Sequence, residues 1–182
     1  QRDPAMTEQH DGTHGKEKGA GAGSLSHIEA GPDGARARMV DVSGKPATER
    51  RAVARAKVEF PPGLLAEVLA GGGPKGPIEE VARVAGVLAA KRTGDLIPMC
   101  HPLGLDVVDV QFEQAGPDLL EIRCTAGCTG PTGVEMEAMM GASVAALTVY
   151  DMTKGASKAI RLGAVELLEK SGGKSGYWVL QQ

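Results

Sequence analysis

Apolar and charged positions alternate over residues 51–60, where Ala52, Ala54, Ala56 and Val58 fall on one side of an extended chain. A period of two is typical of a strand that buries one face and exposes the other. We therefore expect a half-buried strand in this segment.

A different spacing follows over residues 78–92. Apolar residues recur there at intervals of three and four, which predicts an amphipathic helix with a stripe made of Val81, Val84, Ala85, Leu88 and Ala89. Lys91 and Arg92 at its end suit the negative end of the helix dipole.

Shorter patterns and turn residues indicate the other elements. They are a short helix over 64–70 that Gly71, Gly72 and Gly73 interrupt, strands over 105–114 and 118–124 joined by a Gly116-Pro117 turn, a long helix over 134–154 and a strand over 160–168. Without the short helix, the order is strand, helix, strand, strand, helix, strand. This is the ferredoxin-like order of an α+β fold, in which helices pack on an antiparallel sheet.

The long helix is apolar almost all round and contains a run of small residues, namely Gly141, Ala142, Ser143, Ala145 and Ala146. Small residues allow backbones to approach closely, and a helix without a polar face is usually buried. We expect this helix to be buried, in part against another subunit.

One domain is the natural count for 182 residues of which 42% are hydrophobic. Residues 1–23 are polar and rich in glycine, so we expect a disordered tail there and a single catalytic domain over 24–182. Met6 is a candidate natural start, which would make residues 1–5 a remnant of an expression vector.

Composition and charge exclude several classes of partner. The net charge of −3 gives no general attraction for nucleic acid or an anionic membrane, and an aromatic content of 3% is too low for base-stacking platforms. The uncharged stretch 138–150 is too short to cross a bilayer. Cys100, Cys124 and Cys128 form no Cys-x-x-Cys pair, so neither a disulfide framework nor a zinc ribbon is indicated, and we expect a cytoplasmic protein.

Chemically reactive side chains gather over residues 91–103, between and around two prolines. Pro98 and Pro102 restrict the residues before them to extended conformations, so Met99, Cys100 and His101 are predicted on a stiff, non-helical segment. Neighbouring side chains on an extended chain point in opposite directions, which is consistent with a buried Cys100 and a His101 in a cleft. This dipeptide could serve as a metal ligand, as a nucleophile pair or as a hydrogen-bond donor to phosphate. No second histidine supports the metal-binding role.

Asp151 and Lys154 are three residues apart, so on a helix they share a face. They could form an acid–base pair or a simple salt bridge, and the salt bridge is the commoner case for an isolated pair. The apolar residues 142–149 that precede them would remove water and shift their pKa values.

Glu135 and Glu137 are two residues apart and would point about 160° from one another on a regular helix. Both could face one ligand only if the helix began between or after them, with Thr132 as a possible N-cap. The alternative is a pair of acids that stabilises the helix N-terminus. A continuous helix would hold Glu137 and Asp151 about 21 Å apart, so a pocket that uses both must be shared between subunits.

Several sequence blocks together are similar to one known family. They are Leu25-Ser26-His27-Ile28, Met39-Val40-Asp41-Val42-Ser43, Lys75-Gly76, residues 91–103, Thr132-Gly133-Val134-Glu135-Met136-Glu137, Tyr150-Asp151-Met152-Thr153-Lys154 and Lys170-Ser171-Gly172-Gly173-Lys174-Ser175-Gly176. In this order they resemble the MoaC family of molybdenum cofactor biosynthesis. Pro77 departs from the family pattern, which has an acidic residue there in many members; a proline is acceptable in the first turn of a helix.

The resemblance implies a reaction and assigns roles to residues. The substrate would be 3′,8-cyclo-7,8-dihydroguanosine 5′-triphosphate, supplied by a radical SAM enzyme, and the products cyclic pyranopterin monophosphate and pyrophosphate. The implied catalytic residues are Asp151, Lys154 and Lys75. The implied substrate-binding residues are Met99, Cys100, His101, Glu135, Met136, Glu137, Arg50, Lys91, Lys170 and Lys174. The glycines around Lys174 do not form a Walker loop, because the first glycine of that motif is missing and no helix follows.

The resemblance also implies a homo-oligomer, a hexamer built as a trimer of dimers, with sites shared between subunits. No cofactor or protein-bound metal is required by the sequence, although Mg²⁺ could accompany the triphosphate. The rival interpretation is a non-catalytic ferredoxin-like module that binds a small ligand. It does not explain why Lys75, His101, Asp151 and Lys154 accumulate on separate ordered segments.

Overall fold

The computed structural model describes residues 28–31, 34–71 and 77–181, which fall into two compact units that divide after Ala37. The first unit contains an antiparallel hairpin of β1 (Ile28–Gly31) and β2 (Gly34–Ala37), which the sequence patterns did not predict. The predicted tail over 1–23 and the candidate catalytic Lys75 lie outside the described residues.

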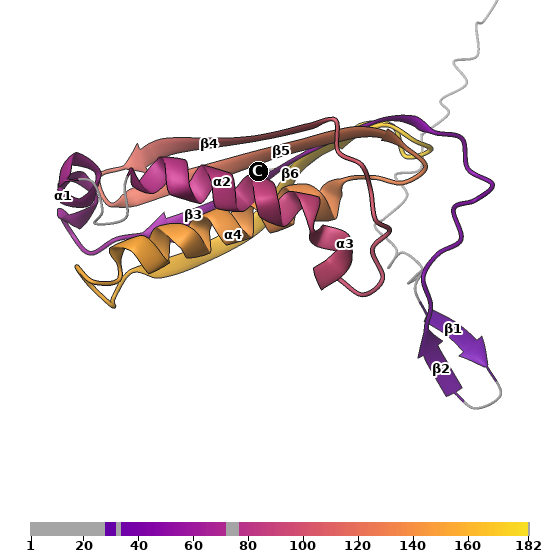
Figure 1. Cartoon of the computed structure of the whole chain (residues 1–182), viewed down its shortest axis with the longest axis horizontal. Helices are drawn as coiled ribbons and strands as arrows, with labels where there is room; N and C mark the ends of the chain where they lie inside the picture. Colours follow the sequence, from indigo (N-terminus) through magenta and orange to yellow (C-terminus); the bar gives the residue numbers. More distant parts are fainter. Residues whose placement is uncertain (1–27, 32–33, 72–76, 182) are drawn as a thin grey trace, which may run out of the picture. The chain divides into compact units, whose positions relative to one another are not determined.

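The second unit is built on a five-stranded antiparallel sheet (Figure 1). Its strands are β3 (Thr48–Glu59), β4 (Val107–Gly116), β5 (Leu119–Gly130), β6 (Arg161–Ser171) and β7 (Trp178–Val179). The spatial order is β4-β5-β3-β6-β7. The four long strands therefore confirm the predicted ferredoxin-like arrangement, and β7 adds a short edge strand that the sequence patterns did not predict.

Two long helices, α2 (Ile78–Lys91) and α4 (Glu135–Thr153), cover one face of this sheet (Figure 1). Shorter helices lie before and after α2, namely α1 (Leu64–Gly71) and α3 (Thr93–Leu96). The core lies under α4, where the alternate residues of β3 are buried from Ala52 to Val58 as their spacing predicted. Pro77 is the N-cap of α2 and precedes its first helical residue.

Small side chains set the distance between α4 and its neighbours. A Cβ atom on Gly141 would overlap the Sγ of Cys124 on β5, and one on Gly86 of α2 would lie 2.9 Å from the Gly141 carbonyl oxygen. The helix therefore packs at near-backbone contact with both the sheet and α2. The expected role of its small residues is confirmed, and the contacts that bury them lie within one chain.

The buried face of α2 differs from the predicted stripe. Ile78, Ala82, Gly86, Ala89 and Ala90 are buried, whereas Val84 and Leu88 are 66% and 48% exposed. The prediction of the helix was right, and the predicted inner face was right for Ala89, which is buried, and Val81, which packs against the core, but wrong for Val84 and Leu88. Close packing on α4 selects the smallest residues for the interface and leaves the larger aliphatic ones outside.

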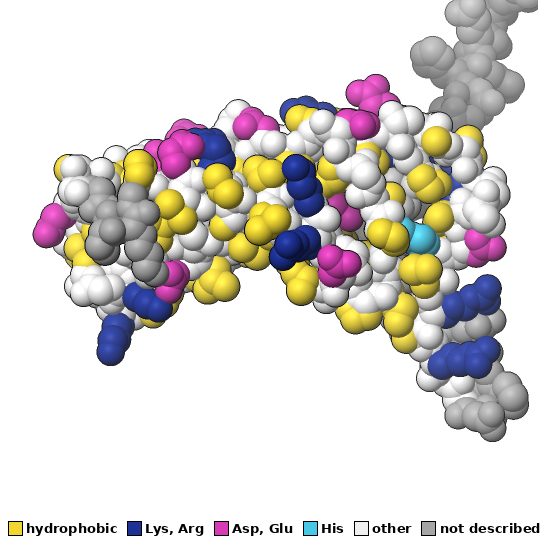
Figure 2. Space-filling view, in the orientation of Figure 1, with side chains coloured by type: hydrophobic (Ala, Val, Ile, Leu, Met, Phe, Trp, Pro, Cys, Tyr) yellow, Lys and Arg dark blue, Asp and Glu magenta, His cyan; other side chains and the backbone are white. Residues whose placement is uncertain are grey.

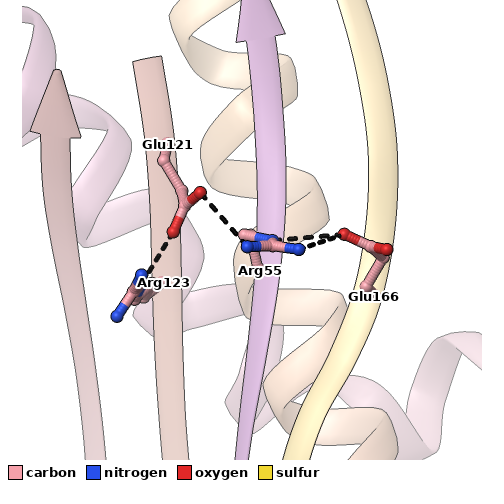
Figure 3. Close-up of polar contacts among 4 residues, drawn as sticks. All are labelled: Arg55, Glu121, Arg123 and Glu166. Atoms are coloured by element: carbon pink, nitrogen blue, oxygen red, sulfur yellow. Dashed lines mark hydrogen bonds and ion pairs between the residues drawn. The ribbon is translucent and has the colours of Figure 1, made fainter. Parts of the chain in front are cut away.

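Charged side chains occupy the opposite face of the sheet (Figure 3). Arg55 alternates with the buried alanines of β3 and donates to Glu166 Oε2 at 2.7 Å and to Glu121 Oε2 at 3.4 Å. Arg123 donates to the other oxygen of Glu121 at 2.7 Å. Glu121 is only 5% exposed, and the two guanidinium groups on either side of its carboxylate offset the cost of removing that charge from water.

Candidate active site

Two acidic residues diverge from the first turn of α4. The N-cap of this helix is Val134 and makes no side-chain hydrogen bond, so the predicted capping role of Thr132 is wrong. The helix begins at Glu135, and Glu135 and Glu137 therefore point to different partners. Glu135 Oε1 accepts a hydrogen bond from Lys170 Nζ at 2.7 Å, whereas the Glu137 side chain is buried.

Burial raises the pKa of Glu137, and the nearby charge of Glu135 raises it further, although the Glu137 backbone N–H acts in the opposite sense. Burial also raises the pKa of the Cys100 and Cys128 thiols, and the charge of Glu137 adds to both shifts. Thiols with raised pKa values are poor nucleophiles. The nucleophile pair considered for Cys100 and His101 therefore has no electrostatic support, and Glu137 is an acid suited to hold a proton.

Arg50 enters the same region from β3, where it is paired with Cys128 on β5. Its guanidinium donates to the carbonyl oxygens of Gly130 at 3.2 Å and Pro131 at 3.3 Å. Gly173, at a φ of 71°, lies so close that any Cβ atom there would overlap the guanidinium. The glycine turn after β6 therefore leaves the space that Arg50 occupies, beside the strand that presents Lys170.

The proline-flanked segment positions the next two candidates. Met99, Cys100 and His101 lie outside any helix, as predicted, and Ile97 before Pro98 is extended. Cys100 lies within the electrostatic influence of Glu137, whereas His101 Nε2 lies 2.7 Å from the Val40 carbonyl oxygen. The two neighbouring side chains thus have separate surroundings, and both are half-buried.

Asp151 and Lys154 lie at the other end of α4. Lys154 Nζ donates to Asp151 Oδ1 at 2.6 Å, and the two side chains are 54% and 45% exposed. The hydrogen bond and the charge of Asp151 raise the pKa of Lys154. The predicted desolvation of this pair by residues 142–149 is therefore wrong within a single chain, and Lys154 is charged at neutral pH.

The candidates thus form two groups along one helix. Near the start of α4 the structure brings together Arg50, Cys100, Glu135, Glu137 and Lys170. Asp151 is fourteen residues beyond Glu137 along the continuous helix, about 21 Å away, and Lys154 follows at the C-cap. Met136 is 38% exposed, and Lys91 and Lys174 are exposed outside both groups.

Cys128 is a neighbour of this site that the sequence patterns did not reveal. It is close to Arg50 only through the pairing of β3 with β5, and to Glu137 only through the packing of α4 on the sheet. Among the described residues, no group of three or more His, Cys, Asp or Glu side chains has a geometry that could hold a metal ion.

A cavity of about 490 Å³ lies on the charged face of the sheet. Its lining includes Arg51, Asp109, Gln111, Arg123 and Glu169, and none of the candidate residues contributes to it. Arg51, Gln111 and Arg123 already bond to carboxylates within the chain. The described candidate residues therefore lie outside this cavity.

The fold and the two polar groups define a ferredoxin-like α+β protein with acidic and basic side chains at both ends of its central helix. The family model described as "MoaC family" matches residues 39–173. The chain belongs to the MoaC family. The matched range contains every described candidate except Lys174.

Curated relatives resemble the chain over most of its length. A protein of Chloroflexus aggregans named "Cyclic pyranopterin monophosphate synthase" is 50% identical over 156 residues, which cover 85% of this chain and 92% of the relative. A Pelobacter propionicus protein of the same name is 53% identical over 141 residues, 77% of this chain and 88% of the relative. "Cyclic pyranopterin monophosphate synthase 1" of Mycobacterium tuberculosis H37Rv is 49% identical over 155 residues, 85% and 89% of the two chains. None of the described helices is long and apolar enough to span a membrane.

Proposed function

We propose that this chain is a cyclic pyranopterin monophosphate synthase of molybdenum cofactor biosynthesis. It converts 3′,8-cyclo-7,8-dihydroguanosine 5′-triphosphate into cyclic pyranopterin monophosphate and releases pyrophosphate. The observation that carries this proposal is the 50% identity to a synthase of that name over 92% of the synthase's length.

Formation of the cyclic phosphate is the first chemical demand. A sugar hydroxyl attacks the α-phosphorus, the bond from that phosphorus to the pyrophosphate oxygen breaks, and pyrophosphate leaves with the charge that develops. Cations positioned at the phosphates stabilise this charge. Arg50 and Lys170 at the start of α4, together with His101 and Lys91, are the groups we assign to it.

Rearrangement of the ring system is the second demand and needs groups that give and take protons. We assign this step to Asp151, Lys154 and Lys75. The raised pKa of Lys154 keeps its ammonium group charged at neutral pH, next to the Asp151 carboxylate that accepts its hydrogen bond. Met136 and Glu137 are assigned to the guanine-derived ring, for which the Glu137 carboxyl group provides a hydrogen-bonding partner, whereas Glu135 is assigned to the phosphate end of the substrate through its ion pair with Lys170.

We further propose a homo-oligomer, a hexamer arranged as a trimer of dimers, in which one chain supplies the start of α4 and its neighbour supplies the end. The separation of about 21 Å between Glu137 and Asp151 supports sharing. Hydrophobic side chains spread over the face of the second unit that carries the helices (Figure 2). Val84 and Leu88 on α2 and Leu147 on α4 are exposed. A neighbouring subunit on this face would bury them and remove water from Asp151 and Lys154.

The remaining parts of the proposal concern supply and cofactors. The substrate comes from a radical SAM enzyme in the cytoplasm, and Mg²⁺ takes part only as a companion of the triphosphate. The closed ring system and the triphosphate of this substrate both arise before it reaches the protein, so the chain itself needs no redox group for the reaction proposed.

The test is direct turnover. Purified protein is incubated with the cyclised triphosphate, pyrophosphate is measured enzymatically, and the organic product is identified by mass spectrometry. We expect pyrophosphate and cyclic pyranopterin monophosphate in equal amounts. Saturable binding of the substrate without release of pyrophosphate would contradict the proposal and indicate a ligand-binding module.

A further inference from the structure

The two nitrogens of the His101 imidazole are not equivalent. Nε2 lies 2.7 Å from the carbonyl oxygen of Val40. A carbonyl oxygen carries no hydrogen and can only accept, so Nε2 must carry the hydrogen of this bond. The ring is therefore held as the Nε2–H tautomer when neutral, and Nδ1 is the nitrogen left for any other partner.

The Val40 carbonyl belongs to a segment fixed by local hydrogen bonds. Asp41 Oδ1 accepts from the backbone N–H of Ser43 at 2.9 Å and from its hydroxyl at 2.7 Å, and the Lys45 N–H donates to the Val42 carbonyl at 3.0 Å. This is an Asx-type turn, in which the side chain takes the place of a backbone acceptor. The turn limits the directions in which the preceding carbonyl can point.

The imidazole is also held through its own backbone. Pro102 restricts the conformation of His101, and Pro102 packs against α3, where a Cβ atom on Gly94 would lie 3.1 Å from the proline Cα. His101 is thus fixed on one side by its chain and on the other by the Val40 carbonyl. The bonds to Ser43 lower the pKa of Asp41, and the charges of Arg38 and His101 lower it further, so an anion stands near the ring at neutral pH.

We propose that His101 meets the substrate through Nδ1, and that Val40 and the Asp41–Ser43 turn are positioning groups that fix this choice. The proposal rests on the proposed function, because the partner is a phosphate oxygen of the triphosphate. Only the imidazolium carries hydrogens on both nitrogens, so only that form donates from Nδ1 to phosphate while it keeps the bond to Val40.

The tautomer can be measured without substrate. Imidazole nitrogens are labelled with ¹⁵N, and the His101 signals are assigned by their loss in His101→Gln, because the other three histidines remain. We expect the neutral ring to carry its hydrogen on Nε2. A hydrogen on Nδ1 in the neutral ring overturns the proposal.

Two variants test which nitrogen acts on the substrate. In His101→Gln the side-chain amide can replace Nε2 and keep the bond to Val40, whereas in His101→Asn the amide takes the place of Nδ1. We expect kcat/KM of the asparagine variant to exceed that of the glutamine variant by about tenfold, the effect of one hydrogen bond to a charged group. Equal activities, or a more active glutamine variant, contradict the proposal.

The turn is tested by a matched pair. Asp41→Asn keeps an oxygen that can accept from Ser43, and Asp41→Ala removes it. We expect Asp41→Ala to weaken the ¹⁵N signal of the Nε2–H tautomer and to raise KM, and we expect Asp41→Asn to restore both in part. An unchanged tautomer signal in Asp41→Ala would contradict the positioning role of the turn. A wild-type protein that releases no pyrophosphate contradicts the proposed function, whereas loss of the asparagine–glutamine difference in an active protein contradicts this proposal alone.

Discussion

Glu137 shows at the scale of one residue how packing sets the chemistry of this site. The residue is 3% exposed, and burial is the largest cause of the raised pKa of its carboxyl group. Burial also raises the pKa values of the neighbouring Cys100 and Cys128 thiols. A proton on Glu137 is therefore more tightly held in the folded chain than in the unfolded one.

This difference predicts a dependence of stability on pH. From the ordinary pKa of 4.5 up to the raised value in the folded chain, the unfolded chain releases the Glu137 proton while the folded chain keeps it. The free energy of unfolding should fall across this window as pH rises, because the folded state binds more protons. Glu137→Gln removes this effect, and urea unfolding should show its stability relative to wild type increasing from pH 4 upward.

Glu166 provides a control of opposite sign. Its hydrogen bond to Arg55 lowers its pKa below 4.5, so its contribution is present above pH 4.5 and is lost as pH falls through the lowered value. Glu166→Gln should reduce stability at neutral pH, with a difference from wild type that shrinks in acid. If both glutamine variants shift stability in the same direction at neutral pH, burial does not govern Glu137.

The catalytic role proposed for Asp151 and Lys154 can be tested directly by substitution. Both side chains are about half-exposed, so their ion pair contributes little to folding. We expect Asp151→Asn and Lys154→Ala to abolish pyrophosphate release while thermal unfolding, followed by circular dichroism, stays close to that of wild type. Near-normal turnover together with reduced stability would identify the pair as a structural salt bridge.

At the scale of elements, the contact of α4 with the sheet depends on the absence of a side chain at Gly141. The Sγ of Cys124 occupies the place where a Cβ atom would stand, and Cys124 is fully buried. Burial raises the pKa of this thiol to about 12, so its part here is packing and not reaction. The Cys124 side chain of β5 thus fills the space that Gly141 leaves on the surface of α4.

We predict that Gly141→Ala costs about 2 kcal/mol of stability, because the added methyl group overpacks the core. Cys124→Ala removes the clashing sulfur and should restore part of this loss, so the double variant should be more stable than the sum of the single effects predicts. Gly71→Ala in α1, where a Cβ atom meets nothing within 4 Å, is the matched control and should not destabilise. Urea unfolding measures all four proteins; strict additivity would contradict the proposed contact.

The elements also show what the sequence could predict. The alternation in β3 and the long apolar run of α4 were sufficient to predict these two elements. A strand buried on one face and a helix buried all round each have a distinct order of apolar and polar residues. The inner face of α2 was predicted only in part, since the closeness of α4 excludes Val84 and Leu88 in favour of smaller residues. The short elements α3 and β7 carry too few residues to show a period, and tertiary contacts define them.

The sequence predicted the residue types of the candidate site better than their spatial arrangement. Its residue types followed from the motifs, and the divergence of Glu135 and Glu137 followed from helix geometry. The proximity of Arg50 to Cys128 and the ion pair of Lys170 with Glu135 depend on strand register and on a long-range contact. No local pattern in the sequence encodes either one.

At the scale of the whole molecule, α4 separates the two groups of candidate residues that one reaction would need. The start of the helix provides Glu137 with Arg50 and Lys170, and its end provides Asp151 with Lys154. We therefore propose that two chains, each contributing one end of α4, complete an active site of the synthase reaction.

Mixing two inactive variants measures this claim directly. Asp151→Asn and Glu137→Ala subunits, each shown to be folded, are allowed to exchange, and native mass spectrometry verifies that mixed oligomers form. Some sites in a mixed oligomer then contain both intact residues, so pyrophosphate release from the cyclised triphosphate should rise well above that of either variant alone. Activity that stays at background after verified exchange would contradict the shared site.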